Sequence, residues 1–319
     1  MSGGNGPVLA LSGGIGGAKL ALGLYRVLPP DTLTVVANTG DDFEHLGLAI
    51  SPDIDTLLYT LSGQDNPELG WGRRDETWTF MAALERLGGE TWFRLGDGDL
   101  ATHVERTRRL ARGESLSAVT DDFRRRFGIA ARLLPPSDDA VRTRLRTAEG
   151  WLDFQDYFVG RRCEPAVEQI VFAGAETARP HPGVLAALAE PGLRLVVVCP
   201  SNPFISIDPI LAVSGIRAAL RDCAAPVVAV SPIVGGKAVK GPTGKMMREL
   251  GLPVGAATVA QHYADFVDVY VADEADARWV QGLDIPVVLA RTLMTTLDDR
   301  EALARVVLRA GERASKRRR

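Results

Sequence analysis

The sequence contains few cysteines and no long apolar run. Its three cysteines in 319 residues form no C-x-x-C pair, which excludes a disulfide framework and a cysteine-based zinc site. No apolar stretch approaches the roughly 18 residues of a membrane-spanning helix. The first residues lack the basic and apolar regions of a signal peptide. We therefore expect a cytoplasmic protein that does not associate with a membrane.

Charge of one sign and aromatic residues are also scarce. The formal net charge of −3 favours neither nucleic acid nor a membrane surface as a partner. Aromatic residues make up 6% of the chain, whereas 46% hydrophobic and 24% charged residues are ordinary for a globular protein. A length of 319 residues suggests about two domains or one elaborated α/β domain, and we expect a single domain over 1–319.

A glycine-rich segment near the N-terminus is the most informative part of the chain. The apolar run Val8–Leu11 predicts a buried strand, and Ser12–Lys19 leads to an apolar helical pattern from Leu20. A strand, a glycine turn and a helix in this order aim backbone N–H groups at an anion, and glycine lets a phosphate approach closely. The segment predicts a phosphate cradle. A tight turn that packs the helix against the strand is the alternative.

The usual dinucleotide and nucleoside triphosphate motifs do not fit this segment. A G-x-G-x-x-G pattern from Gly14 needs glycine or alanine where Lys19 stands, and a Walker motif needs Gly-Lys-Ser/Thr where Ala18-Lys19-Leu20 stands. The next apolar run, 33–38, ends at Asn38, where NAD enzymes place an acidic residue for the adenosine ribose. These departures disfavour a third reading of the chain, an NAD(P)-dependent oxidoreductase.

Four aspartates gather within fifteen residues after the second predicted strand: Asp41, Asp42, Asp53 and Asp55. Hard divalent cations take oxygen ligands, so the group predicts a metal site beside the phosphate cradle. Ser51 and Pro52 are typical of a helix start. The alternative for Asp53 and Asp55 is therefore that they complement a helix dipole.

The pattern of residues changes over 64–150, where apolar runs typical of strands stop and an Arg-rich helical pattern appears. We expect a mainly helical insertion that caps the site. In it, Arg94 is expected to pair with an anion or with one of the aspartates, with a solvated arginine as the alternative, and His103 is expected to have a structural role. Three tryptophans are expected in the core rather than as a stacking platform: Trp71, Trp78 and Trp92.

A second α/β region begins near Glu168, with apolar runs at 170–173, 193–199, 226–230, 267–272 and 286–290. Loops follow at 200–203 and 231–242. The second loop contains Gly235-Gly236-Lys237, whose amides and ammonium suit a phosphate, with a flexible basic loop as the alternative. Strands that alternate with loops and helices predict an α/β fold with a Rossmann-like, mostly parallel sheet flanked by helices.

Six motifs, taken in order over roughly residues 8–295, resemble the CofD/FbiA family of 2-phospho-L-lactate or phosphoenolpyruvate transferases in coenzyme F420 biosynthesis. The motifs are Ser-Gly-Gly-x-Gly-Gly-Ala-Lys, Asn-Thr-Gly-Asp-Asp, Ser-Pro-Asp-Ile-Asp-Thr-Leu-Leu-Tyr, Leu-Gly-Asp-Gly-Asp-Leu-Ala-Thr-His, Pro-Ser-Asn-Pro and Ser-Pro-Ile-Val-Gly-Gly-Lys. The resemblance implies a homodimer and Mg²⁺. It also implies transfer of a phospholactyl or phosphoenolpyruvyl unit from a guanosine diphospho-donor to the deazaflavin Fo, with release of GMP.

The resemblance also implies roles for individual residues. Asp55, Arg94 and Asn38 are implied to bind Fo. Asp41 and Asp55 are implied to be catalytic and to contact the metal, with Asp42 and Asp53 as alternates. The implied nucleotide and phosphate contacts are Ser12, Gly13, Gly14, Gly16, Gly17, Lys19, Ser201, Asn202, Ser231, Gly235, Gly236 and Lys237.

One alternative of another class shares the expected core fold. Regulators of the gluconeogenesis-factor type bind a sugar nucleotide without turning it over. The Asp55/Arg94 pair and the Leu-Gly-Asp-Gly-Asp segment favour the transferase. Segments such as Glu76–Trp78 look closer to the bacterial branch of the family, which favours the phosphoenolpyruvyl donor.

Overall fold

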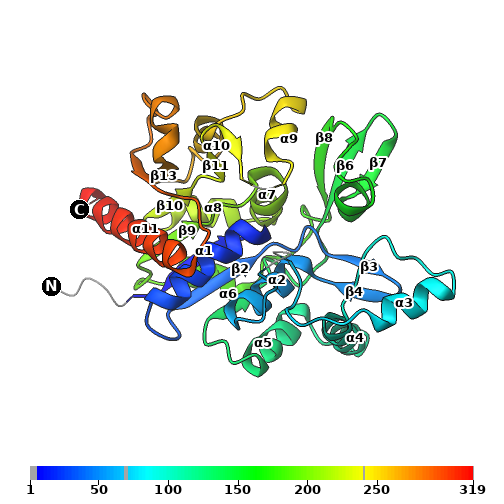
Figure 1. The fold of residues 1–319 in the computed structure, drawn as a ribbon. Coiled ribbons are helices and arrows are strands. Elements are labelled where there is room, and N and C mark those ends of the chain that lie inside the picture. Colours follow the sequence, from blue (N-terminus) through cyan, green and yellow to red (C-terminus); the bar gives the residue numbers. More distant parts are fainter. Residues whose placement is uncertain (1–5, 68–70, 240, 319) are drawn as a thin grey trace.

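The computed structural model describes residues 6–67, 71–239 and 241–318. Residues 68–70 of the expected insertion and Lys240 of the expected phosphate loop lie outside the described residues. Seven parallel strands form the central sheet in the order β14-β13-β10-β9-β1-β2-β5 (Figure 1). Their bounds are β1 Val8–Ser12, β2 Leu33–Ala37, β5 Arg132–Leu134, β9 Leu195–Val198, β10 Val227–Val230, β13 Val269–Asp273 and β14 Val287–Ala290.

The strand order reverses at the middle of the sheet. From β1 the chain adds β2 and β5 on one side, and it then crosses to β9 on the other side and continues outward to β14. This is a doubly wound sheet, in which ligands bind at the carboxyl ends of the strands beside the reversal. The predicted Rossmann-like α/β fold is confirmed.

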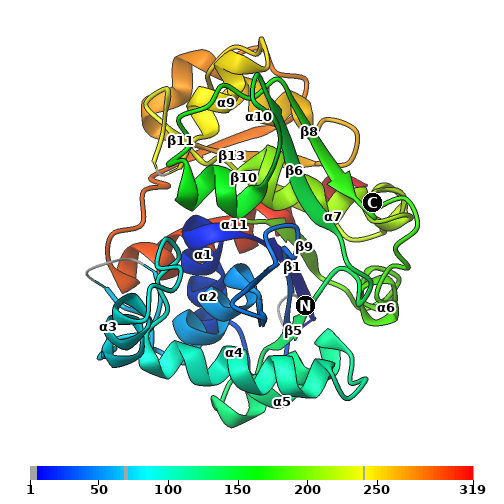
Figure 2. The same ribbon diagram turned by 90° about the vertical axis from the view of Figure 1, so that its right-hand side faces the viewer.

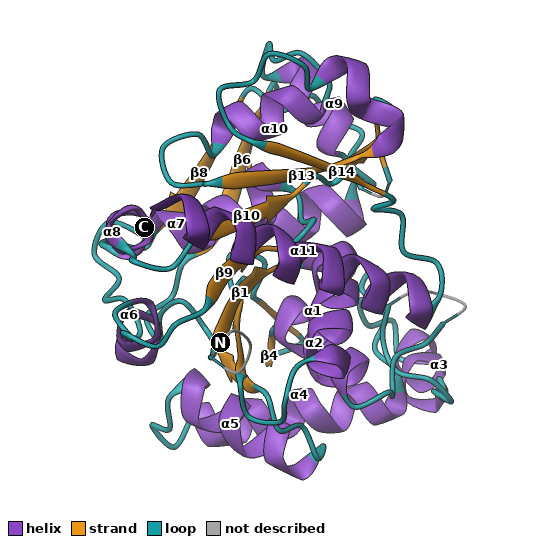
Figure 3. Ribbon diagram, turned by 90° about the vertical axis from the view of Figure 1, so that its left-hand side faces the viewer, coloured by secondary structure: helices purple, strands orange, loops and turns teal. Residues whose placement is uncertain are grey.

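Helices cover both faces of the sheet (Figure 3). Along β1, Val8 and Ala10 pack on one face, and Leu9 and Leu11 pack on the other. Burial on both sides explains why these strands read as continuous apolar runs. The first face is covered by α1 Gly14–Val27, α2 Pro52–Leu61, α5 Leu116–Arg126 and α11 Leu297–Arg318. The second is covered by α6 Pro182–Leu188, α7 Asp208–Ala212, α8 Ile216–Asp222, α9 Thr243–Glu249 and α10 Ala256–His262.

The stretch 64–150 contains helices and strands. Helices α3 Thr79–Arg86 and α4 Asp97–Leu110 lie beside a hairpin of β3 Phe43–His45 and β4 Leu48–Ile50 (Figures 1 and 2). α5 then packs on the central sheet and β5 joins its edge. The helical part of the stretch therefore spans 79–126, and strands follow it.

A second sheet holds a strand that the sequence placed among the parallel ones. β8 Gln169–Ala173 pairs antiparallel with β6 Arg142–Thr147, which also pairs with β7 Gly150–Asp153. Along β6, buried Thr143, Leu145 and Thr147 alternate with less buried arginines. Such alternation is typical of an antiparallel sheet with one face toward solvent, so the expectation for 170–173 was wrong in its pairing.

Across the described ranges, no single helix combines the length and the apolar character needed to cross a bilayer. One bent pair, Pro203–Ala212 with Ile216–Asp222, reaches that composition with an 88° break between its members. Most of the apolar side chains of this pair lie in the core.

Candidate active site

A cavity of about 720 Å³ lies at the carboxyl edge of the central sheet. Residues 13–16 after β1 and 200–202 after β9 line it at the reversal of strand order. Ser231 and Pro232 after β10 and residues 292–294 after β14 line it farther along the same edge. The cavity therefore occupies the crevice where doubly wound sheets bind ligands.

The glycines after β1 belong to a helix rather than to a separate turn. α1 begins at Gly14, and only Gly13 separates it from β1. A Cβ at Gly16 would lie 2.5 Å from the Pro200 carbonyl oxygen, and one at Gly17 would lie 2.5 Å from the Ser201 hydroxyl. The helix starts this early because glycine lets it approach the segment after β9. Close packing therefore requires Gly16 and Gly17, and the prediction of a glycine turn up to Leu20 was wrong.

The start of α1 forms one wall of the cavity. Gly13, Gly14, Gly16 and Lys19 line it, whereas Ser12 and Gly17 are not among its lining residues. Ser201 secures this wall, since its hydroxyl donates to the Gly13 carbonyl (2.7 Å) and accepts from the Gly13 amide (3.1 Å). The first amides of a helix lack intrahelical acceptors, so this wall attracts anions.

Three other expected phosphate contacts, Ser201, Asn202 and Lys19, lie at the same edge of the sheet. Ser201 and Asn202 line the cavity, and Asn202 also accepts the Phe204 amide at 3.0 Å, which starts the next helical turn. The Lys19 ammonium donates to the Met294 carbonyl at 2.8 Å, which links α1 to the segment after β14.

All four predicted aspartates are buried, and one of them, Asp53, contacts Gly14. Asp53 accepts the Gly14 amide (2.7 Å) and the Asn38 amide group (2.9 Å). Burial raises the pKa of Asp41 well above its usual value, and the charge of Asp53 adds to the rise. Burial also raises the pKa of Asp42 to about 7 and that of Asp53 to about 6. The expected Fo contact Asn38 is fully buried and orders this cluster instead of lining the cavity.

The acidic cluster fits a hard cation. Within the described ranges, one carboxylate oxygen of Asp41 and one of Asp42 are buried without a hydrogen-bond partner. Unpaired buried charge is costly, and oxygen ligands are those that Mg²⁺ prefers. Asp41 and Asp53 also line the cavity, whereas Asp42 does not and is bound by the Ser51 hydroxyl at 2.8 Å.

Asp55 lines the cavity but is paired with an arginine from the insertion. Both terminal nitrogens of Arg106 donate to its carboxylate, one of them at 3.0 Å. The His103 ring lies next to the same pair, with its Nδ1 3.6 Å from an Asp55 oxygen. The predicted partner Arg94 does not make this contact.

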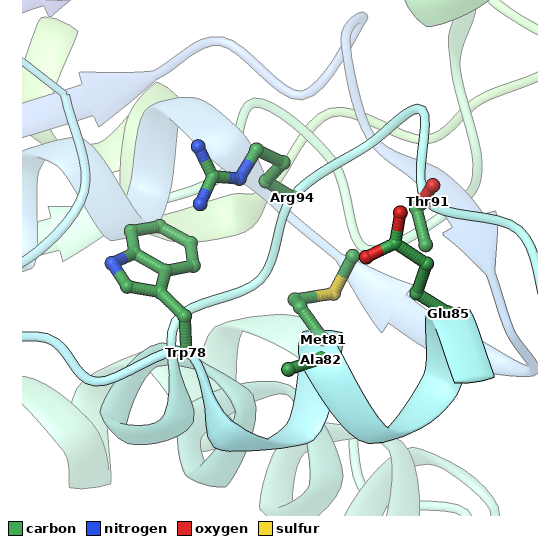
Figure 4. Close-up of a pocket in the computed structure, with 6 residues that line it drawn as sticks. All are labelled: Trp78, Met81, Ala82, Glu85, Thr91 and Arg94. Carbon is green, nitrogen blue, oxygen red and sulfur yellow. The ribbon is translucent and has the colours of Figure 1, made fainter.

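Arg94 lies instead over the Trp78 ring at 4.2 Å (Figure 4). It lines the main cavity and also a smaller hollow of about 300 Å³ beside α3. Figure 4 shows the guanidinium directed over the indole, with Glu85 and Thr91 on the other side of the hollow. A stacked guanidinium keeps its charge available to an anion at the cavity mouth.

Aromatic side chains crowd the cavity mouth. Trp71 and Trp92 are 45% and 37% exposed and line it, so the expectation that they belong to the core was wrong. Phe154 and Phe158 face the cavity as a stacked pair with ring centroids 5.3 Å apart. Exposed aromatic rings around a cavity suit a flat conjugated ligand.

The second glycine segment has a different environment. The Gly235 and Gly236 amides donate to the Asp276 carboxylate at 3.0 and 2.7 Å. Neither glycine lines the cavity, nor does Lys237, whereas Ser231 at the start of the loop does. The donors expected to hold phosphate thus bind a carboxylate of the protein. The hairpin of β11 Ile233–Val234 and β12 Lys237–Ala238 is tied to the segment after β13.

Sequence reasoning missed a polar group on α4. Asp99 and His103 line the cavity, with 3.2 Å between the carboxylate and the ring Nε2, and Arg106 lies one turn farther along. Their spacing of four and then three residues places all three on one helix face, which was the available signal. Asp55, Asp99 and His103 could hold a metal ion by geometry. A cation there competes with Arg106 for Asp55.

A solved structure supports the fold assignment. A member of the UPF0052 family from Bacillus halodurans superposes with a TM-score of 0.64 at 14% identity, and the match covers 95% of this chain and 99% of that one. At this identity the likeness concerns the fold alone.

Sequence relatives carry the assignment further. A family model described as 2-phospho-L-lactate transferase CofD matches residues 8–283. A phosphoenolpyruvate transferase from Kitasatospora aureofaciens is 42% identical over 304 residues, which cover 93% of this chain and 94% of the relative. A 2-phospho-L-lactate transferase from Methanosarcina mazei is 40% identical over 306 residues, which cover 95% and 100%. This chain therefore belongs to the CofD family of transferases.

Proposed function

We propose that this enzyme moves a phosphoenolpyruvyl or 2-phospholactyl group from a guanosine diphospho-donor to the 5′-hydroxyl of the deazaflavin Fo. One observation carries the proposal. A single cavity of about 720 Å³ brings together the helix start at 13–16, the aspartates and the aromatic mouth. A donor with two phosphates and a flat acceptor need these three surfaces within reach of one another.

The two substrates are assigned to opposite ends of this cavity. The amides at the start of α1, with Ser201, Asn202 and Lys19, hold the donor's phosphates. The exposed rings of Trp71, Trp92 and Phe158 hold the tricyclic ring of Fo, and Arg94 and Asp55 face its polar atoms. The segment Gly235–Lys237 supports the wall without touching phosphate, because none of its three residues lines the cavity and its glycine amides bind Asp276.

Asp41 and Asp53, with Asp42 behind them, are the residues that would hold Mg²⁺. When bound, this ion neutralises charge on the donor's phosphates. The assignment divides the four aspartates: Asp55 is engaged by Arg106, while Asp41 keeps a buried oxygen unpaired.

The chemistry then depends on positioning and on charge. The 5′-hydroxyl oxygen of Fo attacks the phosphorus that bears the three-carbon acid, and the bond from that phosphorus to the oxygen of GMP breaks in line. The hydroxyl proton is released to solvent once the new P–O bond has formed. Asp55 accepts the hydrogen bond of the attacking hydroxyl and aims its lone pair. The start of α1 and Lys19 offset the negative charge that grows on the departing GMP. Phosphoryl transfer of this kind requires no protein nucleophile.

A product assay tests the proposal. The protein is incubated with Fo, Mg²⁺ and either donor, and products are identified by mass spectrometry. We expect GMP together with Fo that has gained the phosphorylated acid. Absence of product with both donors would contradict the proposal. A fluorescence titration with Fo adds a second test, because a regulator of the sugar-nucleotide type should not bind the deazaflavin.

We further propose that the enzyme is a cytoplasmic homodimer, as the family resemblance implies. Light scattering of the purified chain should give twice the mass of 34.3 kDa. A mass of one chain at micromolar concentration would contradict the dimer. Fractionation of producing cells tests the location.

A further inference from the structure

We propose that Arg106 and His103 are positioning residues that fix the Asp55 carboxylate toward the acceptor end of the cavity. The inference deepens the proposed function and rests on it. It assigns a purpose to a charged group that the helical insertion carries into the interior.

Arg106 is among the largest fully buried side chains, with 1% of its surface exposed. It meets Asp55 with both terminal nitrogens and also approaches the Ala49 carbonyl at 3.4 Å. The planar fork of a guanidinium fixes both oxygens of a carboxylate at once. Because an ion pair gains little over apolar packing in the interior, its presence beside the cavity favours a role in orientation.

His103 supports the same carboxylate from the adjacent turn. Its Nδ1 lies 3.3 Å from Arg106 Nη1, and its Nε2 lies 3.2 Å from an Asp99 oxygen. Asp99 in turn accepts the Tyr59 hydroxyl at 2.6 Å. The ring thus lies between Asp99 and the Arg106–Asp55 pair.

The start of α4 is anchored independently. Glu76 accepts the Gly98 and Asp99 amides at 2.6 and 2.7 Å, and Asp97 accepts the Phe80 amide at 3.0 Å. The helix therefore presents Asp99, His103 and Arg106 as one rigid face. Arg106 is not among the residues that line the cavity, so it acts on substrates through Asp55.

The test is Arg106→Lys, which keeps the charge and removes the fork. We expect kcat to fall about 100-fold, as for a misplaced reacting group, with KM for both substrates within about threefold of wild type. Arg109→Lys is the matched control, because Arg109 is on the same helix and pairs with Glu114 and Asp122. It should keep the wild-type kcat.

Rates are expressed per donor-binding site, which separates positioning from folding. If Arg106 has only a structural role, the variant will have fewer donor-binding sites and a lower melting temperature, but the rate per site will be unchanged. That result would overturn the inference. If Arg106→Lys does not fold, His103→Asn gives the same test with an expected loss of about tenfold.

Coupling supplies a second readout. In an Asp55→Asn background, single-turnover assays should show less than about a threefold further loss from Arg106→Lys, because the carboxylate that it orients is gone. Additive losses would contradict action through Asp55. If the wild-type enzyme shows no turnover, the proposed function itself is refuted. If the wild type turns over and Arg106→Lys turns over equally fast, only the role of Arg106 is refuted.

Discussion

Two glycine segments that look alike in sequence have different surroundings in the molecule. Gly13, Gly14 and Gly16 line the cavity, whereas Gly235 and Gly236 do not. Both segments offer amides to a carboxylate, since Asp53 accepts from Gly14, and Asp276 accepts from the second pair. A glycine-rich segment thus provides anion-binding amides, and the fold determines whether a ligand or the protein itself uses them.

The largest effect should come from Asp55, which lines the same cavity as the first segment but meets Arg106 and not a glycine amide. Asp55→Ala should lower transfer by at least about 1,000-fold, because it removes the group that aims the attacking hydroxyl and leaves Arg106 unpaired. Binding of GDP, measured by calorimetry, should stay within about threefold, because the phosphate wall is separate. Loss of GDP binding in a folded variant would contradict the division of the cavity.

The next effect tests the first segment directly. In Gly16→Ala the new Cβ meets the Pro200 oxygen at 2.5 Å, so the start of α1 must shift. A shift of about 1 Å should cost about 100-fold in kcat/KM for the donor. Gly255→Ala is the control, because no atom of the described residues lies within 4 Å of its added Cβ. If the two variants have equal activities, the first glycine segment does not bind the donor.

A smaller effect, mainly on stability, is expected in the second segment. Asp276 is fully buried, and Asp276→Asn replaces one acceptor by a donor that faces a glycine amide. The free energy of unfolding should fall by about 1–3 kcal/mol, with donor KM changed only a few-fold. Urea denaturation and steady-state kinetics measure the two quantities. If Asp276→Asn loses donor binding but keeps its stability, the second glycine segment belongs to the donor site and this prediction is wrong.

The same residue gives a pH dependence of known sign. Burial raises the pKa of Asp276 above the unfolded value of 3.8, despite the two amides that lower it. Its contribution to stability is therefore fully present below pH 3.8 and is lost as the pH rises through the folded pKa. Asp265 has the opposite sign, because its hydrogen bond to Arg217 lowers its pKa. Differences in unfolding free energy between wild type and each Asp→Asn variant should run in opposite directions with pH.

The smallest effect is expected for Lys237→Ala. The side chain is exposed and does not line the cavity, so kcat/KM should change by less than about threefold, within the range of a surface substitution. Steady-state kinetics at low salt is the measurement. A tenfold loss of kcat/KM would indicate that this loop binds phosphate after all.

The fold was readable from the sequence because of how parallel sheets are buried. Runs such as 195–199 are apolar throughout, which marks strands covered on both faces, and the polar segments after them marked one edge. The same rule placed Gly14 and Asp55 at one crevice, and both line the cavity. The strand at 170–173 escaped the rule because its antiparallel partner, β6, lies in a different sheet.

The hydrogen-bonded pairs within the site could not be predicted from the sequence. Asp55 meets Arg106, 51 positions later. The spacing of Asp99, His103 and Arg106 indicates a shared helix face but does not identify Asp55 as its partner. The Asp276 carboxylate that occupies the Gly235 amide lies 41 positions away. Such contacts depend on where helices dock, whereas local patterns report only which residues are apolar. The exposure of Trp71 at the cavity mouth was hidden for the same reason.

The most direct measurement is a crystal structure of the protein with GDP, Mg²⁺ and Fo. We expect the GDP phosphates at the amides of residues 15 and 16 and the Fo ring among Trp71, Trp92 and Phe158, with its 5′-hydroxyl at Asp55. Phosphates bound at Gly235–Lys237, or Fo outside this cavity, would contradict this expectation.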